Sequence, residues 1–297
     1  MKELNFIKTI ELQIGKKFLG DDCAYLTELG IVVSQDSLVE NIHFKRNWCT
    51  PYQLGYKSVA VNISDILASG AQPKYLTIAL SLTNFADENF IKEFYRGANS
   101  VCSDVEIVGG DITGSKTDIM VSVTAIGITK GRNISSRKYA KEGYILVTKG
   151  NYGSSALGLE KLQKGKKDSE FVKYHLEPEL EYDFSKQIAK TVKEEYAMMD
   201  TSDGITDALF RIAEASGVKI VADYDKIPHL KEVKTEHVLF GGEDYKLVAA
   251  IPKKYLTQIN GAVQIGEVHT YDGTRVEIAG NKYSSYDELR VFNHFGE

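Results

Sequence analysis

Apolar residues in the first half of the chain recur at two spacings, which indicate helices and strands. A spacing of three to four residues predicts a helix, and alternation with polar residues predicts a half-buried strand. The first half is expected to contain a helix over residues 4–18, a hairpin over residues 23–26 and 30–34, a helix over residues 51–69, a strand over residues 75–82, a helix over residues 87–102, and strands over residues 106–108 and 119–128.

The helix over residues 51–69 has clear signals at both ends. Thr50 favours the N-cap position, and Pro51 suits the first helical position because its missing N–H has no partner there anyway. Gly70 ends the apolar pattern in the way that a C-terminal glycine does. This helix carries the polar residues Asn62 and Asp65.

A second series of elements begins after the polar stretch 132–143. It comprises a strand over residues 144–147, helices over residues 156–162, 170–176 and 184–192, an extended segment over residues 198–201, a helix over residues 205–215, and strands over residues 219–222 and 245–251. The order resembles that of the first half. We therefore place a domain boundary near residue 140 and predict domains over residues 1–140 and 141–297, each of ordinary size.

Composition and charge narrow the class of partner. With 43% hydrophobic and 26% charged residues, the 297-residue chain is typical of compact globular proteins. Its formal net charge of −5 provides no field to attract nucleic acid or an acidic membrane surface. The sequence shows neither a signal peptide nor an apolar run long enough to span a membrane. The three cysteines are widely spaced and predict neither a zinc site nor a disulfide framework, so we expect a cytoplasmic protein.

Aspartates stand at the ends of several predicted elements, beside glycine, serine and apolar residues. Any one of them has an ordinary alternative role as a helix cap or turn residue. Convergence of several on a hard divalent cation explains the set better, because such cations prefer oxygen ligands and bridge to phosphate. The segments are Gly20-Asp21-Asp22, Ser34-Gln35-Asp36, Asn62-Ile63-Ser64-Asp65, Gly109-Gly110-Asp111 and Asp200-Thr201-Ser202-Asp203-Gly204.

The sequence contains neither a Walker A motif nor a GxGxxG turn, the two common glycine-rich phosphate cradles. Phosphate groups would then be neutralised by metal ions held on carboxylates. Magnesium is the simplest expectation, since no EF-hand pattern points to calcium.

Motifs spread over nearly the whole chain resemble one family. They are GDDCAYL at residues 20–26, SQDSLVENIHF at 34–44, GYKSVAVNISDILASGAQP at 55–73, VGGDITG at 108–114, DTSDGITDAL at 200–209, GGEDYKL at 241–247, IGEV at 265–268 and FNHF at 292–295. In this order they resemble the thiamine-monophosphate kinase family, a member of the aminoimidazole-ribonucleotide-synthetase-like (PurM-like) superfamily.

The resemblance implies a fold, a reaction and an assembly. The implied fold is α+β, with an N-terminal mixed sheet that pairs in a dimer barrel and a C-terminal α/β domain. The implied reaction is ATP-dependent phosphorylation of thiamine monophosphate to thiamine diphosphate, by in-line transfer with several Mg²⁺ ions and no phosphoenzyme. The implied assembly is a homodimer with the active site near the interface.

The resemblance also implies roles for individual residues. Metal-site positions of the family match Asp22, Ser34, Gln35, Asp36, Asp65, Asp111, Asp200 and Asp203, of which Asp36, Asp111 and Asp203 are the expected catalytic residues. Nucleotide-contacting positions match Tyr95, Gly110, Asp111, Arg137 and Ser202, and positions that contact thiamine phosphate match His43, Glu243 and Phe292. The chain departs from the family in having Gln35 where threonine is common, and Ile112 within the GGDTT motif.

Each of these residues also has an ordinary structural role to weigh against the functional one. His43 suits a strand, Glu243 a turn beside two glycines, and Arg137 a solvated basic linker. Tyr95 and Phe292 are residue types that most often pack in a core or lie on a surface. The motif context is what favours the functional roles.

Two alternatives to the kinase stay open. One is another ATP-using enzyme of the superfamily, although the cysteines are not where a selenophosphate synthetase or a hydrogenase maturation dehydratase is expected to have one. The other is a catalytically silent relative that binds a nucleotide or a metal. ATP consumption stimulated by thiamine monophosphate would separate an enzyme from the silent relative.

Overall fold

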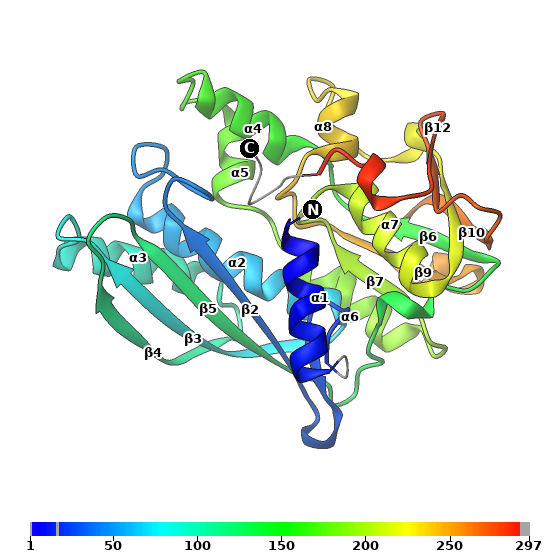
Figure 1. Cartoon of the computed structure of the whole chain (residues 1–297), viewed down its shortest axis with the longest axis horizontal. Helices are drawn as coiled ribbons and strands as arrows, with labels where there is room; N and C mark the ends of the chain where they lie inside the picture. Colours follow the sequence, from blue (N-terminus) through cyan, green and yellow to red (C-terminus); the bar gives the residue numbers. More distant parts are fainter. Residues whose placement is uncertain (1, 16–17, 292–297) are drawn as a thin grey trace.

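The computed structural model describes residues 2–15 and 18–291, with side chains from residue 5 onward (Figure 1). A first sheet has five strands in the order β1-β2-β5-β3-β4. They are β1 (Ala24–Leu26), β2 (Ile31–Val39), β3 (Gln72–Leu82), β4 (Glu106–Gly114) and β5 (Met120–Ile128). β3 and β4 run parallel, the other neighbours run antiparallel, and β4 lies at one edge.

Helices α2 (Pro51–Ala68) and α3 (Glu88–Val101) cover one face of the first sheet (Figure 1). α2 begins with the predicted cap, because the Thr50 hydroxyl accepts a hydrogen bond from the Gln53 backbone N–H at 3.2 Å. The two helices touch at Gly97, where a Cβ atom would lie 1.8 Å from the carbonyl oxygen of Tyr52. We call the opposite face of this sheet, which none of the described helices covers, the open face.

A second sheet has seven strands in the order β12-β11-β8-β10-β6-β9-β7. They are β6 (Tyr144–Thr148), β7 (Ala197–Asp200), β8 (Val218–Ala222), β9 (Leu247–Pro252), β10 (Val263–Thr270), β11 (Val276–Ile278) and β12 (Asn281–Tyr283). Its central strands are buried on both faces. In β9, alternate residues face two separate hydrophobic clusters: Leu247 and Ala249 face one, Val248 and Ala250 the other.

The helix α2 lies between the two sheets. One cluster joins Ile63 and Ile66 of α2 to Leu247 of β9 and to Ile188 of α6 (Tyr182–Thr191). The other contains α7 (Ile205–Ser216), on the far face of the second sheet. The two sheets fall on either side of residue 140, but they share a core, so the predicted division into two domains stays a prediction.

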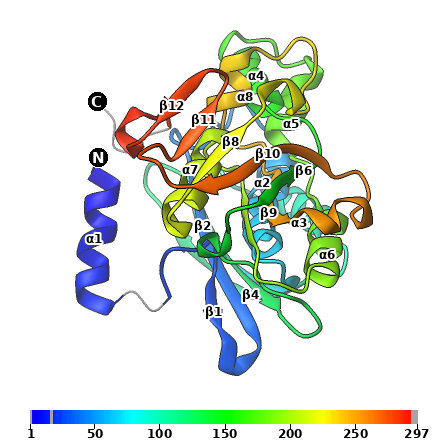
Figure 2. The same ribbon diagram turned by 90° about the vertical axis from the view of Figure 1, so that its right-hand side faces the viewer.

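The remaining helices lie outside these layers (Figure 2). They are α1 (Lys2–Ile14), α4 (Ser154–Gln163), α5 (Glu170–Leu176) and α8 (Thr235–Phe240), with the 3₁₀ turns η1 (Thr27–Leu29), η2 (Arg137–Tyr139), η3 (Tyr224–Lys226), η4 (Lys253–Gln258) and η5 (Tyr286–Glu288). Figure 2 shows α1 standing beside the body of the molecule. Among the described helices, none is both long and apolar enough to cross a membrane.

The α+β fold class is confirmed, and the predicted elements differ from the structure mainly at weakly patterned strands. The strand predicted over residues 106–108 extends to Gly114, although Gly109 and Gly110 disfavour strands, because β3 pairs with it along its length. β10, β11, β12 and α8 had no prediction, because their short, largely polar stretches carry little periodicity.

Candidate active site

Three aspartates from separate parts of the chain meet at the junction of the two sheets. Asp22 precedes β1, Asp65 lies in the last turn of α2, and Asp200 ends β7. One carboxylate oxygen of each lies within 4.8 Å of the others. We call these three residues the acidic cluster.

The carboxyl groups of the acidic cluster are harder to ionise than ordinary aspartate side chains. Burial is the main factor that raises the pKa of all three carboxyl groups, and that of Asp200 reaches about 8. Neighbouring carboxylates raise the pKa of Asp65 and Asp200 further. Two hydroxyls stabilise the cluster: Ser34 donates to Asp65, and Ser64 donates to Oδ2 of Asp200 at 2.5 Å. A divalent cation would favour the ionised state of all three, and oxygen ligands of this kind suit Mg²⁺.

Arg137 lies in η2 and contacts the acidic cluster from one side. Its guanidinium Nη2 donates to Oδ1 of Asp22 at 2.5 Å, and only 15% of its side chain is exposed. Its backbone N–H donates to Asp21 at 2.7 Å, which fixes the start of η2. Its buried Nε has no hydrogen-bond partner among the described residues. A guanidinium with a spare donor beside a carboxylate cluster suits contact with a phosphate oxygen.

The strand β2 contributes to both faces of its sheet. Ser34 and Asp36 lie on the face that α2 covers, where the Asp36 N–H donates to Oδ1 of Asn62 at 2.8 Å. The charge of Asp36 helps to raise the pKa of Asp65 and Asp200, so Asp36 adjoins the acidic cluster. Gln35 points to the open face, where its amide donates to Ser122 at 3.2 Å. The Gln35 side chain therefore lies on the opposite side of the sheet from the acidic cluster, and its predicted ligand role stays a prediction.

Asp111 and Gly110 lie far from the acidic cluster within one chain. Gly110 shares a cross-strand row with Asp36 but stands three strands away, a separation of about 14 Å. Asp111 pairs with Ala79 and points to the open face, away from Asp65. A Cβ atom at Gly110 would lie 1.9 Å from the carbonyl oxygen of Ile78, so packing alone requires glycine there.

Two other predicted nucleotide contacts, Tyr95 and Ser202, lie on different elements of the fold. Tyr95 is half-buried on α3, where its ring packs edge-on against Phe94 with 5.5 Å between ring centroids. Ser202 and Asp203 lie in the loop between β7 and α7, next to Asp200 in sequence. The Ser202 carbonyl accepts a hydrogen bond from the Glu243 N–H at 2.7 Å, which ties this loop to the GGEDYKL segment.

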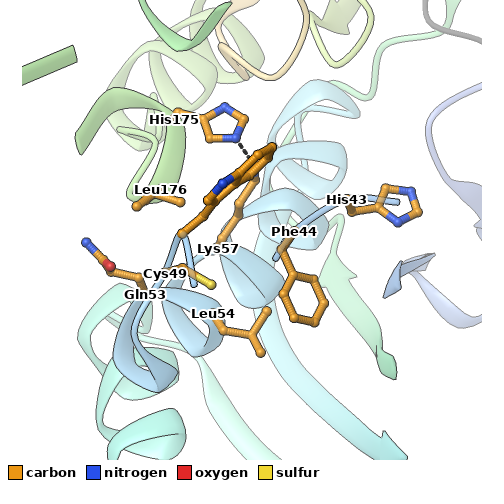
Figure 3. A pocket seen from close by; sticks show the side chains of 9 residues that line it. His43, Phe44, Cys49, Gln53, Leu54, Lys57, His175 and Leu176 are labelled. Carbon is orange, nitrogen blue, oxygen red and sulfur yellow. Dashed lines mark hydrogen bonds between the residues drawn. The ribbon is translucent and has the colours of Figure 1, made fainter. Parts of the chain in front are cut away.

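His43 and Glu243, two predicted acceptor contacts, are brought into one region. Nδ1 of His43 accepts a hydrogen bond from the Val39 N–H at 3.0 Å, so a neutral His43 ring carries its proton on Nε2. Lys57 and, to a smaller degree, His175 and His43 lower the pKa of Glu243 against the effect of burial. Figure 3 shows His43, Lys57 and His175 around one small pocket. Phe292, the third predicted contact, lies outside the described residues.

Lys57 and His175 had no role in the sequence prediction. Lys57 contacts Glu243 and is buried in α2, between Leu54 and Val61 on the core-facing side. A lysine at a core position of an otherwise apolar helix pattern was the available signal, since such a charge needs a partner. His175 carried no comparable signal, because its partners Lys57, Ser155 and Glu243 all lie on other elements of the fold.

The chain is similar in sequence to known proteins over most of its length. A family model described as AIR synthase related protein, N-terminal domain, matches residues 20–129. The chain is 33% identical to the thiamine-monophosphate kinase of Aquifex aeolicus (strain VF5), over 95% of this chain and 97% of that protein. It is 31% identical to the thiamine-monophosphate kinase of Bacillus subtilis (strain 168), over 93% of each.

Solved structures also match the chain over nearly its whole length. The structure described as "AaThiL complexed with AMPPCP and TMP" matches with a TM-score of 0.89 at 31% identity, over 99% of this chain and 98% of that one. The hydrogenase maturation protein HypE of E. coli, at 17% identity and a TM-score of 0.67 over 94% of this chain and 96% of that one, shares the fold alone.

The two sheets and the matched N-terminal domain define the class, that of the AIR-synthase-related proteins with the PurM-like fold. Within that class, the family is shown by the identity of 31% to 33% with thiamine-monophosphate kinases over more than nine tenths of the chain. The chain belongs to the thiamine-monophosphate kinase family and is therefore a kinase.

Proposed function

We propose that the chain transfers the γ-phosphoryl group of ATP to thiamine monophosphate, with release of ADP and thiamine diphosphate, the last step in making that cofactor. The observation that carries the proposal is the similarity, over nearly the whole chain, to a structure described as complexed with AMPPCP, an ATP analogue, and TMP. The acidic cluster is the second support, because it offers a phosphate-directed metal site where no glycine-rich cradle exists.

The chemistry asks little of the protein beyond position and charge. A phosphate monoester has a second pKa of about 6, so the attacking oxygen of the acceptor is already ionised at neutral pH and needs no general base. Several Mg²⁺ ions, held by Asp22, Asp36, Asp65 and Asp200, would supply neutralisation of the phosphate charges. Arg137 adds a fixed guanidinium beside them. We therefore propose direct in-line transfer without a phosphoenzyme.

We also propose that the chain acts as a cytoplasmic homodimer that pairs its first sheets. The edge strand β4 and its surroundings support this, because the side chains of Val108, Ile112 and Met120 are 56%, 62% and 40% exposed. Apolar edge strands of this length are normally covered. A partner would also explain how Asp111, remote from the acidic cluster of its own chain, contributes to a shared site. Sedimentation that finds an active monomer would contradict this assembly.

The direct test is product identification after incubation with ATP, Mg²⁺ and either thiamine or thiamine monophosphate. We expect thiamine diphosphate and ADP from the monophosphate alone. Formation of no thiamine diphosphate, or phosphorylation of thiamine itself, would overturn the proposal.

Variants of the predicted site residues test which of them serve metal binding and which serve acceptor binding. Asp111→Asn and Asp203→Asn are expected to abolish turnover, since each removes a carboxylate assigned to metal binding. His43→Ala is expected to raise the KM for thiamine monophosphate about tenfold with little change in kcat, because His43 contacts the acceptor. Steady-state kinetics with each substrate varied would check both, and near-normal turnover of the Asp variants would count against the scheme.

A further inference from the structure

Lys57 is a lysine in the middle of α2 with only 3% of its side chain exposed. An ammonium group in such a place needs partners, because removing it from water is costly. Two are present: Nζ lies 2.9 Å from Oε1 of Glu243 and 3.5 Å from Nε2 of His175. Lys57 thus joins a helix of the first half of the chain to two segments of the second half.

The lysine also decides where the proton of His175 sits. An ammonium group can only donate, so Nε2 of His175 accepts and the ring proton lies on Nδ1. Nδ1 lies 3.3 Å from Oε2 of Glu243 and 3.0 Å from the hydroxyl oxygen of Ser155. Burial, together with the charge of Lys57, lowers the pKa of His175 to about 4, so the ring is neutral at physiological pH. Both oxygens of Glu243 therefore face hydrogen-bond donors.

The loop that carries Glu243 is held in an unfavourable conformation. Glu243 has φ 64° and Tyr245 has φ 51°, a left-handed region that residues with a side chain rarely adopt. Asp244, between them, accepts hydrogen bonds from the N–H groups of Gly153 at 2.5 Å and Ser155 at 3.0 Å, at the start of α4. Such conformations persist only where the surroundings enforce them, and they are concentrated at functional sites.

We propose that Lys57 and His175 are positioning residues that hold the Glu243 carboxylate toward the acceptor site beside His43. The inference rests on the proposed function and deepens it, because it assigns to this buried set the binding of the acceptor and not of the nucleotide. Glu243 keeps 25% of its side chain exposed although its two carboxylate oxygens lie beside Lys57 and His175, so part of the side chain is accessible from outside. In this assignment the acidic cluster binds the phosphate groups, and the Lys57–His175–Glu243 set contacts the organic part of the acceptor.

The test compares substrate KM values for three variants of the full chain. Lys57→Met removes the charge that orients Glu243, and we expect the KM for thiamine monophosphate to rise at least about tenfold. The KM for ATP should stay within about twofold, since Lys57 contacts none of the cluster carboxylates. His175→Asn keeps an amide near the Nδ1 position and should behave more like the wild type than His175→Gln, which places its amide near Nε2.

Ser185→Ala is the matched control. Its hydroxyl donates a buried hydrogen bond of 2.7 Å from α6 to the Leu67 carbonyl, so it also links α2 to the second half, but away from the pocket. We expect it to lower the melting temperature and leave both KM values unchanged.

The outcomes separate the inference from the proposed function. Wild-type turnover of thiamine monophosphate is measured first, and its absence would overturn the proposed function and the inference together. Wild-type turnover with an unchanged acceptor KM in folded Lys57→Met would overturn the inference alone. If Lys57→Met does not fold, equal acceptor KM values for His175→Asn and His175→Gln would overturn it.

Discussion

The acidic cluster and the Lys57–His175–Glu243 set both bury ionisable groups, but they balance charge in opposite ways. In the cluster, three carboxyl groups lie close together with the guanidinium of Arg137 paired to one of them, and their pKa values are raised. In the set, a lysine and a histidine face one carboxylate, and the pKa of Glu243 is lowered.

This difference indicates which of the two regions needs a bound ligand to balance its charges. Carboxyl groups with raised pKa values are poised to exchange protons for a cation, so the acidic cluster suits the metal ion proposed for it. A buried ion pair with hydrogen bonds on both sides is satisfied by the fold itself. The first region is therefore suited to balance its charges with a bound ligand, whereas the second balances its charges within the fold before the proposed acceptor binds.

Of the variants that test this comparison, Asp200→Asn is expected to have the largest effect. It should lower kcat at least about a hundredfold, because it removes a proposed metal ligand, yet leave the unfolding free energy of the metal-free protein unchanged or higher, because it removes a carboxyl group whose ionised form is disfavoured by burial and by neighbouring carboxylates. Steady-state kinetics and urea unfolding in EDTA measure the two quantities. Asp183→Asn, at an exposed position on α6, is the control. A strongly destabilised, metal-free Asp200→Asn would remove the contrast between the regions.

Lys57→Met should show the reverse pattern in stability. Removing one partner of a buried pair leaves Glu243 uncompensated, and we expect a loss of about 3 kcal/mol in the free energy of unfolding. Ser185→Ala should lose only about 1 kcal/mol, the usual contribution of one hydrogen bond. Urea denaturation in EDTA would check both values, and equal losses would show that the charge pair has no special part in stability.

Magnesium should stabilise the protein more at high pH than at low pH. The pKa of Asp200 is raised from 3.8 to about 8, so the folded state keeps a proton that the unfolded chain has lost. The stability from this proton is present at low pH and disappears as the pH rises through about 8. Metal must displace the proton, so apparent Mg²⁺ affinity should grow by up to about tenfold per pH unit between pH 6 and 8.

Melting temperatures with Mg²⁺ and with EDTA across this pH range measure the effect, and Asp200→Asn should reduce its pH dependence. A Mg²⁺ shift in melting temperature that is the same at every pH would contradict proton displacement at the cluster.

The smallest effect is expected at Gln35. Its side chain lies on the open face and hydrogen-bonds Ser122, so Gln35→Ala should change kcat by less than about twofold. Ser34→Ala, one residue earlier but on the cluster side, should reduce activity more. Kinetics of the two variants in parallel would decide, and a larger loss at Gln35 would restore it as a ligand.

Much of the molecule follows from local sequence alone. The Thr50-Pro51 cap, the apolar spacing that follows it and the alternation over β5 depend on contacts within a few residues, and the structure confirms both elements. The predicted elements also placed Asp22 and Asp200 at the ends of strands, where the structure has them. These predictions succeeded because helix and strand periodicity are properties of neighbouring residues.

Tertiary structure alone decided which of those residues meet. Ser64 and Asp200 are 136 residues apart and Lys57 and His175 are 118 apart, and only the packing of α2 between two sheets brings each pair together. The packing of α2 likewise decided that the face with Ser34, and not the face with Gln35, meets the acidic cluster, and the strand order set Asp111 three strands from Asp36. Spacing along a chain specifies the face of an element, but distances between elements arise from burial of their shared apolar surfaces.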